Sequence, residues 1–136
     1  MKGKLYLVSV KDMEKVPNDI EHKYHIVRSC KNSQYYTSKG WRVVPQLSPN
    51  PVLFSQYLEW SRAGQWDLDT FASKYRPAFL EQMQTDDIMR RKLNEVRDLL
   101  SNGYDVVFMC YCDSFLCHRF ILGEQYKMRG YEVISL

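Results

Sequence analysis

Long apolar runs, a dense basic stripe and a glycine-rich phosphate loop are all missing from this chain of 136 residues. No run approaches the roughly 18 apolar residues that a membrane span needs, and the stretch MKGKLYLVSVKD has too short an apolar part for a signal peptide. The formal charge of +3 permits an anionic ligand, but without a Lys/Arg stripe it does not favour nucleic acid as a partner. We therefore expect a cytoplasmic protein with no membrane partner.

Cysteine is scarce as well, with four residues in the chain. A cytoplasmic protein keeps its thiols reduced, so we do not expect a disulfide framework. The C-x5-R loop of cysteine phosphatases is also missing, since Arg119 follows Cys117 by only two positions. What the chain does have is 45% hydrophobic residues, which at this length suffices for one domain with its own core.

Periodicity and turn residues divide the chain into short strands and longer helices. Apolar, β-rich segments predict strands at Lys4–Val10, Lys23–Cys30, Tyr104–Cys112 and Tyr131–Leu136. Helices are predicted at Pro51–Gly64, Trp66–Met83, Thr85–Gly103 and Cys117–Gly130, and a polar loop at Lys31–Trp41. Asn50 and Thr85 are expected helix caps, and Pro77 should kink or break its helix.

The apolar run 104–112 is typical of a strand buried on both faces of a parallel sheet. With the following helix and the last strand it forms a β-α-β unit. We therefore predict the α/β class, with a small, mostly parallel sheet flanked by helices in a Rossmann-like three-layer arrangement.

The stretch CYCDSFLCHRF, residues 110–120, holds three of the four cysteines. Its placement puts Cys117, His118 and Arg119 at the start of a helix, just beyond the end of a parallel strand, where α/β proteins bind ligands. Arg119 suits a phosphate or carboxylate group, and the helix N-terminus should lower the pKa of Cys117. An arginine that only ties down neighbouring carbonyl groups is the structural alternative.

A metal site is not predicted, because the C-x-C-x4-C-H spacing differs from the usual zinc pairs and adjacent Cys117 and His118 would have to bind one ion. Cys110 and Cys112 do share a face of their strand, so a metal held by Cys110, Cys112 and Cys117 is the alternative. We expect no cofactor, and Cys110 and Cys112 to pack as small hydrophobic residues. The enzymatic alternative makes Cys117 a nucleophile and His118 its base, in a transferase or hydrolase acting on a nucleotide-like substrate.

Other candidate ligand residues flank the predicted strand ends. Arg28 would share a cleft with Arg119 if their strands are neighbours, although a surface ion pair is an equal alternative. Tyr36 and Trp41 are candidates to stack on a base or to close the cleft, or else to cover the sheet edge. Tyr111 and Asp113, beside the end of the strand, complete the expected ligand-binding set.

The C-terminal stretch resembles the signature of the DUF488 family, a family of unknown function. Cys110, Cys117, His118 and Arg119 match its pattern, and Trp66, Phe71, Tyr75 and Arg28 resemble upstream family features. Two features depart from the pattern: Cys112 stands where an acid is expected, and the loop before Cys117 is about one residue short. The resemblance implies one α/β domain, residues 1–136, with a site but no established reaction.

From these observations we expect a protein that binds a small anionic or nucleotide-like ligand around the Cys-His-Arg segment. The enzyme with Cys117 as nucleophile is one alternative. An interaction protein of phage or mobile-element origin, which blocks or sequesters a host factor or signal, is another. Whether the chain forms a homo-oligomer stays open.

Overall fold

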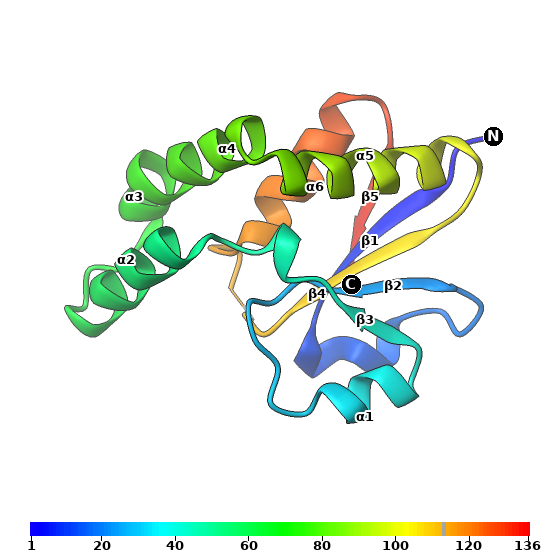
Figure 1. The fold of residues 1–136 in the computed structure, drawn as a ribbon, viewed down its shortest axis with the longest axis horizontal. Coiled ribbons are helices and arrows are strands. Elements are labelled where there is room, and N and C mark those ends of the chain that lie inside the picture. The colour runs from blue at the N-terminus through cyan, green and yellow to red at the C-terminus, as the bar shows by residue number, and fades with distance from the viewer. Residues whose placement is uncertain (113) are drawn as a thin grey trace.

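In the computed structural model, which describes residues 1–112 and 114–136, five parallel strands form one sheet in the order β3-β2-β4-β1-β5 (Figure 1). The strands are β1 (Lys4–Ser9), β2 (His22–His25), β3 (Trp41–Val43), β4 (Val106–Cys110) and β5 (Glu132–Ser135). Helices flank this sheet in a Rossmann-like arrangement, which confirms the predicted fold class.

Strand β4 is the centre of the sheet, and all five of its residues are buried. It pairs with β1 on one side and with β2 on the other. The continuously apolar sequence of this strand follows from that position, because a central strand packs against side chains on both faces.

The helices are α1 (Ser33–Ser38), α2 (Pro51–Arg62), α3 (Leu68–Thr70), α4 (Arg76–Thr85), α5 (Asp87–Ser101) and α6 (His118–Met128). A π-helical turn, Phe71–Tyr75, joins α3 to α4, and 3-10 turns occupy Val10–Lys15 and Pro45–Leu47. In the part of the chain that the structure describes, no helix is both long enough and apolar enough to cross a membrane.

Side chains alternate between two hydrophobic clusters on opposite faces of the sheet. Phe108 and Leu7 belong to the larger cluster, which α4, α5 and α6 cover. Val107 and Met109 belong to the smaller one, which the segments around the first 3-10 turn and α1 cover (Figure 1). The smaller cluster also contains Trp41.

Several local signals work as predicted. Asn50 caps α2 by accepting a hydrogen bond from the backbone N–H of Leu53, with Pro51 at the first helical position. Pro77 lies in the first turn of α4, directly after the π-helical turn. The backbone at Thr70, Phe71, Tyr75 and Arg76 stays right-handed helical, so the predicted helix 66–83 is not broken but contains a π-helical turn just before Pro77, which lacks the N–H of a regular helical residue.

Three local predictions were wrong. The segment 31–41 is not a plain loop, because it contains α1 and the first residue of β3. Strand β2 ends at His25 rather than at Cys30. Helix α5 is capped by Asp86, whose carboxylate accepts from the N–H groups of Ile88 and Met89, whereas the hydroxyl of Thr85 donates back to Glu81.

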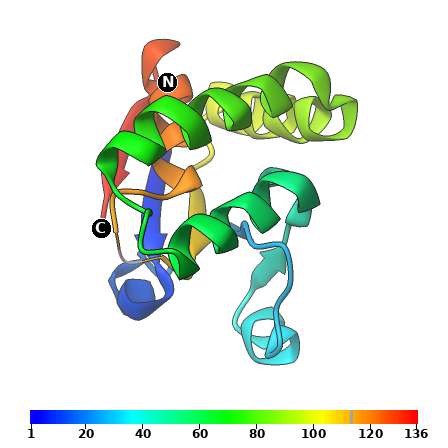
Figure 2. The same ribbon diagram turned by 90° about the vertical axis from the view of Figure 1, so that its left-hand side faces the viewer.

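Helices α2 to α4 form an arm that extends beyond the sheet and turns back on itself (Figures 1 and 2). Its two limbs are held together by aromatic rings. Trp66 makes edge-on contacts with Tyr57 at 4.8 Å and with Tyr75 at 5.1 Å between ring centroids. The arm therefore places a group of aromatic side chains beside the carboxyl ends of β2 and β4.

Candidate functional site

A pocket of about 480 Å³ opens at the carboxyl ends of β2 and β4. One wall is aromatic and comes from the helical arm, with Phe54, Tyr57, Trp66 and Tyr75. The remaining lining mixes apolar side chains such as Val27 and Leu116 with polar, cationic and thiol-bearing ones. It comes from the segments that follow the two strands, from Ser48 and Pro49 before α2, and from the start of α6. This location is where α/β sheets bind their ligands, as the sequence predicts.

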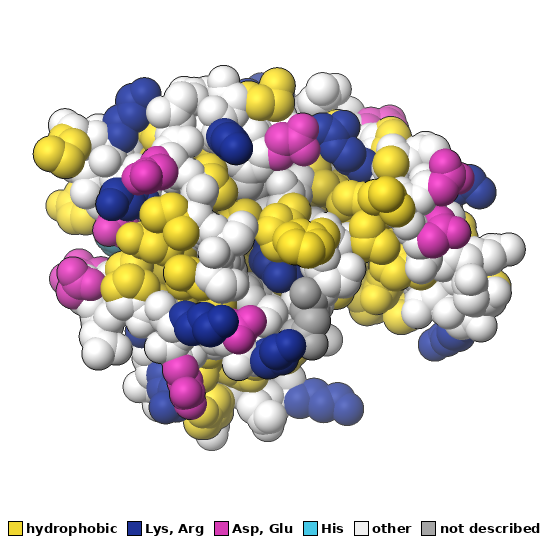
Figure 3. Space-filling view, turned by 180° about the vertical axis from the view of Figure 1, so that it is seen from behind, with side chains coloured by type: hydrophobic (Ala, Val, Ile, Leu, Met, Phe, Trp, Pro, Cys, Tyr) yellow, Lys and Arg dark blue, Asp and Glu magenta, His cyan; other side chains and the backbone are white. Residues whose placement is uncertain are grey.

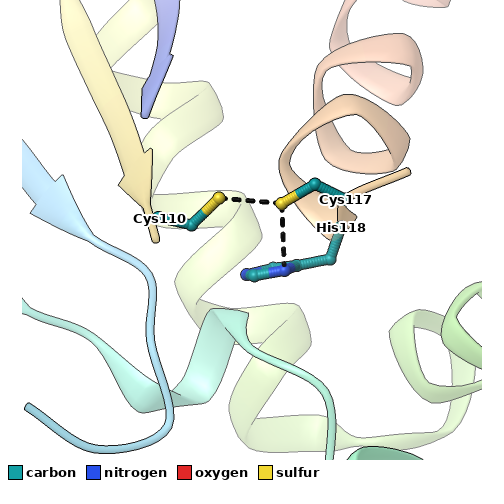
Figure 4. Close-up of side chains that lie close together, drawn as sticks. All are labelled: Cys110, Cys117 and His118. Atoms are coloured by element: carbon teal, nitrogen blue, oxygen red, sulfur yellow. Dashed lines mark hydrogen bonds between the residues drawn. The ribbon is translucent and has the colours of Figure 1, made fainter. Parts of the chain in front are cut away.

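The floor of the pocket brings together Cys110, Cys117 and His118 (Figure 4). Cys110 is the last residue of β4, Cys117 is the N-cap of α6, and His118 is its first helical residue. The two sulfur atoms share a hydrogen bond at 2.7 Å, and Nδ1 of His118 lies 3.7 Å from Sγ of Cys117. None of the four cysteines forms a disulfide.

The tautomer of His118 follows from its hydrogen bond to the backbone. Its Nε2 lies 2.7 Å from the carbonyl oxygen of Ile26, and because a carbonyl only accepts, Nε2 carries the proton. Burial lowers the pKa of His118 to about 4, so that the ring is neutral near pH 7. Nδ1 therefore presents a lone pair to the two thiols.

The two thiols differ in acidity, and the pKa of Cys117 is shifted in the opposite direction from the prediction. Burial and the hydrogen bond to Cys110 raise the pKa of Cys117 well above its ordinary value. The hydrogen bond from Cys117 and the positive charge of Arg119 lower the pKa of Cys110. The prediction that the helix N-terminus would lower the pKa of Cys117 was wrong, because desolvation outweighs the helix dipole at a side chain that is 1% exposed.

Arg119 is buried and turned back toward the end of β4. Its Nη1 donates to the carbonyl oxygen of Cys112 at 2.6 Å and to Sγ of Cys110 at 3.0 Å, and its guanidinium lies 4.4 Å from the ring centroid of Phe120. It is not among the residues that line the pocket. The geometry corresponds to the structural alternative, in which the arginine ties down the loop.

Arg28 does reach the pocket. Strands β2 and β4 are neighbours, as the shared-cleft hypothesis requires, and Arg28 follows β2 closely. It lines the pocket, and its Nη1 is buried without a hydrogen-bond partner among the described residues. Lys31 adds a second cation to the same lining.

Of the other residues predicted to bind a ligand, some line the pocket and some lie on the opposite face of the sheet. Tyr36 and Trp41 are buried in the smaller hydrophobic cluster and do not line the pocket. Tyr111 does line it, and its hydroxyl donates to Sγ of Cys30 at 3.3 Å. Asp113 lies outside the described residues.

Sequence reasoning missed Tyr57 and treated Tyr75 as a core residue, although both belong to the aromatic wall. Tyr75 is indeed 4% exposed, so that it serves both the core and the pocket. The dense succession of aromatic residues between 54 and 75 was the available signal. That succession does not predict that α2 and the α3–α4 helix fold back onto each other.

Comparison with curated proteins and with solved structures gave no match. A family model described as the active DUF488-N3 subclade matches residues 8–130, which include the two strands, the aromatic arm and the Cys-His-Arg segment. The chain therefore belongs to the DUF488 family, as the pattern of Cys110, Cys117, His118 and Arg119 predicts.

Proposed function

We propose that this protein binds a small ligand with an anionic group and a planar ring, such as a nucleotide, in the pocket at the ends of β2 and β4. The observation that carries this proposal is the buried Nη1 of Arg28, which has no partner among the described residues. A buried donor without an acceptor is costly, by about 1–3 kcal/mol or more for a charged group. A phosphate or carboxylate in the pocket would satisfy it.

The aromatic wall supports a ligand with a ring. Trp66, Tyr57 and Phe54 line the side of the pocket that the arm provides. Stacking of a base on an aromatic side chain contributes about 1–3 kcal/mol and tolerates any base. Anion recognition at one end and stacking at the other would together select a nucleotide-like molecule.

The size and the surface of the protein agree with a small ligand. A pocket of about 480 Å³ falls within the roughly 300–1,000 Å³ that small-molecule sites occupy. On the face seen in Figure 3, Lys and Arg side chains are interspersed with Asp and Glu rather than gathered into one stripe. This face therefore offers no continuous basic stripe to a long polyanionic partner.

A second candidate is an enzyme in which Cys117 is the nucleophile and His118 its base. Adjacent residues at a helix start usually point in different directions, yet Sγ of Cys117 and Nδ1 of His118 lie 3.7 Å from each other. Ile26 orients the imidazole through Nε2, as a third group does in nucleophile–base pairs. A transferase or hydrolase acting on a nucleotide-like substrate would use this arrangement.

Isothermal titration with adenosine monophosphate, adenosine and inorganic phosphate tests the binding proposal. We expect the monophosphate to bind most tightly, and Arg28→Ala to weaken it about ten- to a hundredfold through loss of a charge-assisted hydrogen bond. Arg91→Ala, at an exposed position of α5, is the matched control and should bind like the original protein. If none of the probes binds, or if Arg28→Ala binds the monophosphate unchanged, the proposal is wrong.

The enzyme candidate has its own test. Incubation of the bound nucleotide with the protein, followed by chromatography of the products, should show turnover that Cys117→Ser abolishes. Binding by Cys117→Ser should remain, because serine is close to cysteine in size and is a favoured residue at the N-cap position of α6. Binding without turnover in the original protein would leave only the first candidate.

A further inference from the structure

We infer that Cys110, Cys117 and His118 form a zinc site whose fourth coordination position faces the pocket. This inference goes beyond ligand binding and does not depend on it. The three donor atoms, two sulfurs and one ring nitrogen, all lie within 4.8 Å of one another, and all three residues are buried. Figure 4 shows the side chains converging from β4 and from the start of α6.

The separations suit a tetrahedral centre after a small adjustment. With Zn–S bonds of about 2.3 Å and Zn–N bonds of about 2.0–2.1 Å, a sulfur and a nitrogen lie roughly 3.6 Å apart and two sulfurs roughly 3.8 Å. Sγ of Cys117 and Nδ1 of His118 are 3.7 Å apart, which already fits. The two sulfurs are 2.7 Å apart and would separate by about 1 Å to admit the ion.

The fixed tautomer of His118 is a second and independent observation. Histidines that bind zinc usually donate their other N–H to a carbonyl or carboxylate, which fixes the ring and its lone pair. Nε2–H of His118 donates to the carbonyl oxygen of Ile26, which leaves Nδ1 as the ligating atom. The hydrogen bond from Arg119 to Sγ of Cys110, 3.0 Å long, likewise supports a ligating sulfur from outside.

The adjacency of Cys117 and His118 argued against a metal in the sequence and does not do so in the structure. Cys117 is the N-cap and has an extended backbone, with φ −140° and ψ 145°, whereas His118 begins the helix. The change of backbone conformation between the two residues turns both side chains to the same side (Figure 4). Two thiols and an imidazole form a soft set that prefers zinc to magnesium or calcium.

The fourth position is assigned to the pocket because all three ligand residues line it. A zinc ion with three protein ligands and one open position is the arrangement of catalytic rather than structural sites. There it would bind a ligand atom or a water molecule whose pKa it lowers to about 7. Zinc bound in this way would occupy both Cys117 and His118, and so would replace the nucleophile–base pair as the source of reactivity.

Metal analysis of the protein tests the inference. Protein produced with zinc in the medium and purified without chelators should carry about one zinc ion per chain. Cobalt added to the chelator-treated protein should give thiolate-to-cobalt charge transfer and the intense visible bands of a tetrahedral site. Cys110→Ser, Cys117→Ser and His118→Gln should each lose at least about tenfold in zinc affinity, because loss of a ligand costs no less than the roughly 10–100-fold loss that follows removal of an outer-shell partner.

Two cysteine variants are matched controls. Cys30→Ser changes a thiol outside the three-residue set and should keep its zinc. Cys112→Ser should also keep it, and loss of zinc from this variant would show that a fourth protein ligand closes the site. Circular dichroism of every variant shows whether it is folded, and the cobalt spectrum of the unsubstituted protein does not depend on any variant.

The inference is overturned if the protein binds neither zinc nor cobalt with thiolate ligation. It is equally overturned if the folded Cys110→Ser, Cys117→Ser and His118→Gln variants keep full zinc affinity, or if Cys110 and Cys117 prove to be joined in a disulfide in the freshly purified protein. Titration of adenosine monophosphate into the chelator-treated protein is a separate measurement. Binding there would preserve the proposed function even where the zinc site fails.

Discussion

His118 joins the start of α6 to the segment after β2 through a 2.7 Å hydrogen bond from Nε2–H to the carbonyl oxygen of Ile26. The backbone N–H of Ile26 in turn donates to the carbonyl oxygen of Met109 on β4. Three separate segments of the chain are therefore fixed relative to one another at one point. That point is the floor of the pocket, so the fold itself brings Cys110, Cys117 and His118 together.

Replacing Arg119 should cost stability. Arg119→Ala removes the hydrogen bonds to the carbonyl oxygen of Cys112 and to Sγ of Cys110, and leaves the carbonyl without that donor. We expect the free energy of unfolding to fall by about 2–3 kcal/mol, as for a hydrogen bond from a charged group. Urea denaturation measures this change, and Arg91→Ala, expected within about 0.5 kcal/mol of the original, is the control. Unchanged stability with weakened nucleotide binding would instead restore the anion-binding role predicted for Arg119.

Stability should fall as the pH is lowered below 6.5, in part because of His25. Burial lowers the pKa of His25 to about 4, whereas the unfolded chain binds this proton near the ordinary value of 6.5. The neutral His25 ring therefore contributes its full share to the free energy of unfolding above pH 6.5. This share is lost between pH 6.5 and 4, and at 1.4 kcal/mol per pKa unit it amounts to up to about 3 kcal/mol. Among the residues that the structure describes, His25 contacts Tyr36, Tyr111 and Cys30, and none of these three is a carboxylate that would stabilise the charged ring.

His25→Phe isolates this effect. Nε2 of His25 is buried without a hydrogen-bond partner among the described residues, so that a phenyl ring gives up no bond at that position. The variant should lose the part of the pH dependence that comes from His25, whose pKa burial lowers to about 4. Denaturant titrations at pH 5 and pH 7 measure the difference. A variant as sensitive to acid as the original would show that His25 is not a source of the effect.

The parts of the fold that the sequence predicts are those with a local cause. The apolar run of β4 and the cap Asn50 each act within a few residues, and each behaves as expected. The order of the strands required one further step, because only the structure shows that β2 rather than another strand lies beside β4. That neighbour relationship is what brings Arg28 to the Cys-His-Arg segment.

The parts of the site that could not be predicted depend on side-chain direction and on contacts distant in sequence. The guanidinium group of Arg119 could bind an anion by its chemistry. In the fold, however, the carbonyl group of Cys112 lies within its reach and accepts its hydrogen bond instead. Cys117 lies at a helix N-terminus, but it is buried in the larger hydrophobic cluster together with Tyr75 and Phe79, which are distant from it in sequence. Trp66 and Tyr57 meet because α2 and α3 fold back on each other, which no local pattern specifies.

Gln82 should hold the backbone segment Ser48–Asn50 in place at the rim of the pocket. Its buried side chain accepts from the backbone N–H of Asn50 at 2.8 Å and donates to the carbonyl oxygen of Ser48 at 2.9 Å. Gln82→Ala leaves both backbone groups without these partners, and we expect the free energy of unfolding to fall by about 2–4 kcal/mol. Because Ser48 and Pro49 line the pocket, nucleotide affinity should fall too.

The exposed Gln84, two residues further along α4, provides the control for Gln82. Gln84→Ala should change the free energy of unfolding by less than about 0.5 kcal/mol. Gln82→Glu adds a second comparison, because its carboxylate can still accept from Asn50 but cannot donate to Ser48 when ionised. If Gln82→Ala is as stable as Gln84→Ala in urea denaturation, these two hydrogen bonds do not hold the segment.

Variants of two tryptophans test which side of the sheet a ligand ring stacks against. Trp66 lines the pocket, whereas Trp41 is buried in the smaller hydrophobic cluster and does not. Trp66→Leu keeps an apolar side chain but removes the ring, and it should weaken binding of adenosine monophosphate by about 1–3 kcal/mol. Trp41→Phe keeps a ring in its cluster and should leave affinity unchanged. Calorimetric titration of both variants, with melting temperatures to show that they are folded, measures the contrast. The opposite result, with Trp41→Phe impaired and Trp66→Leu intact, would place the ligand against the β3 side of the sheet and return the stacking role to Trp41.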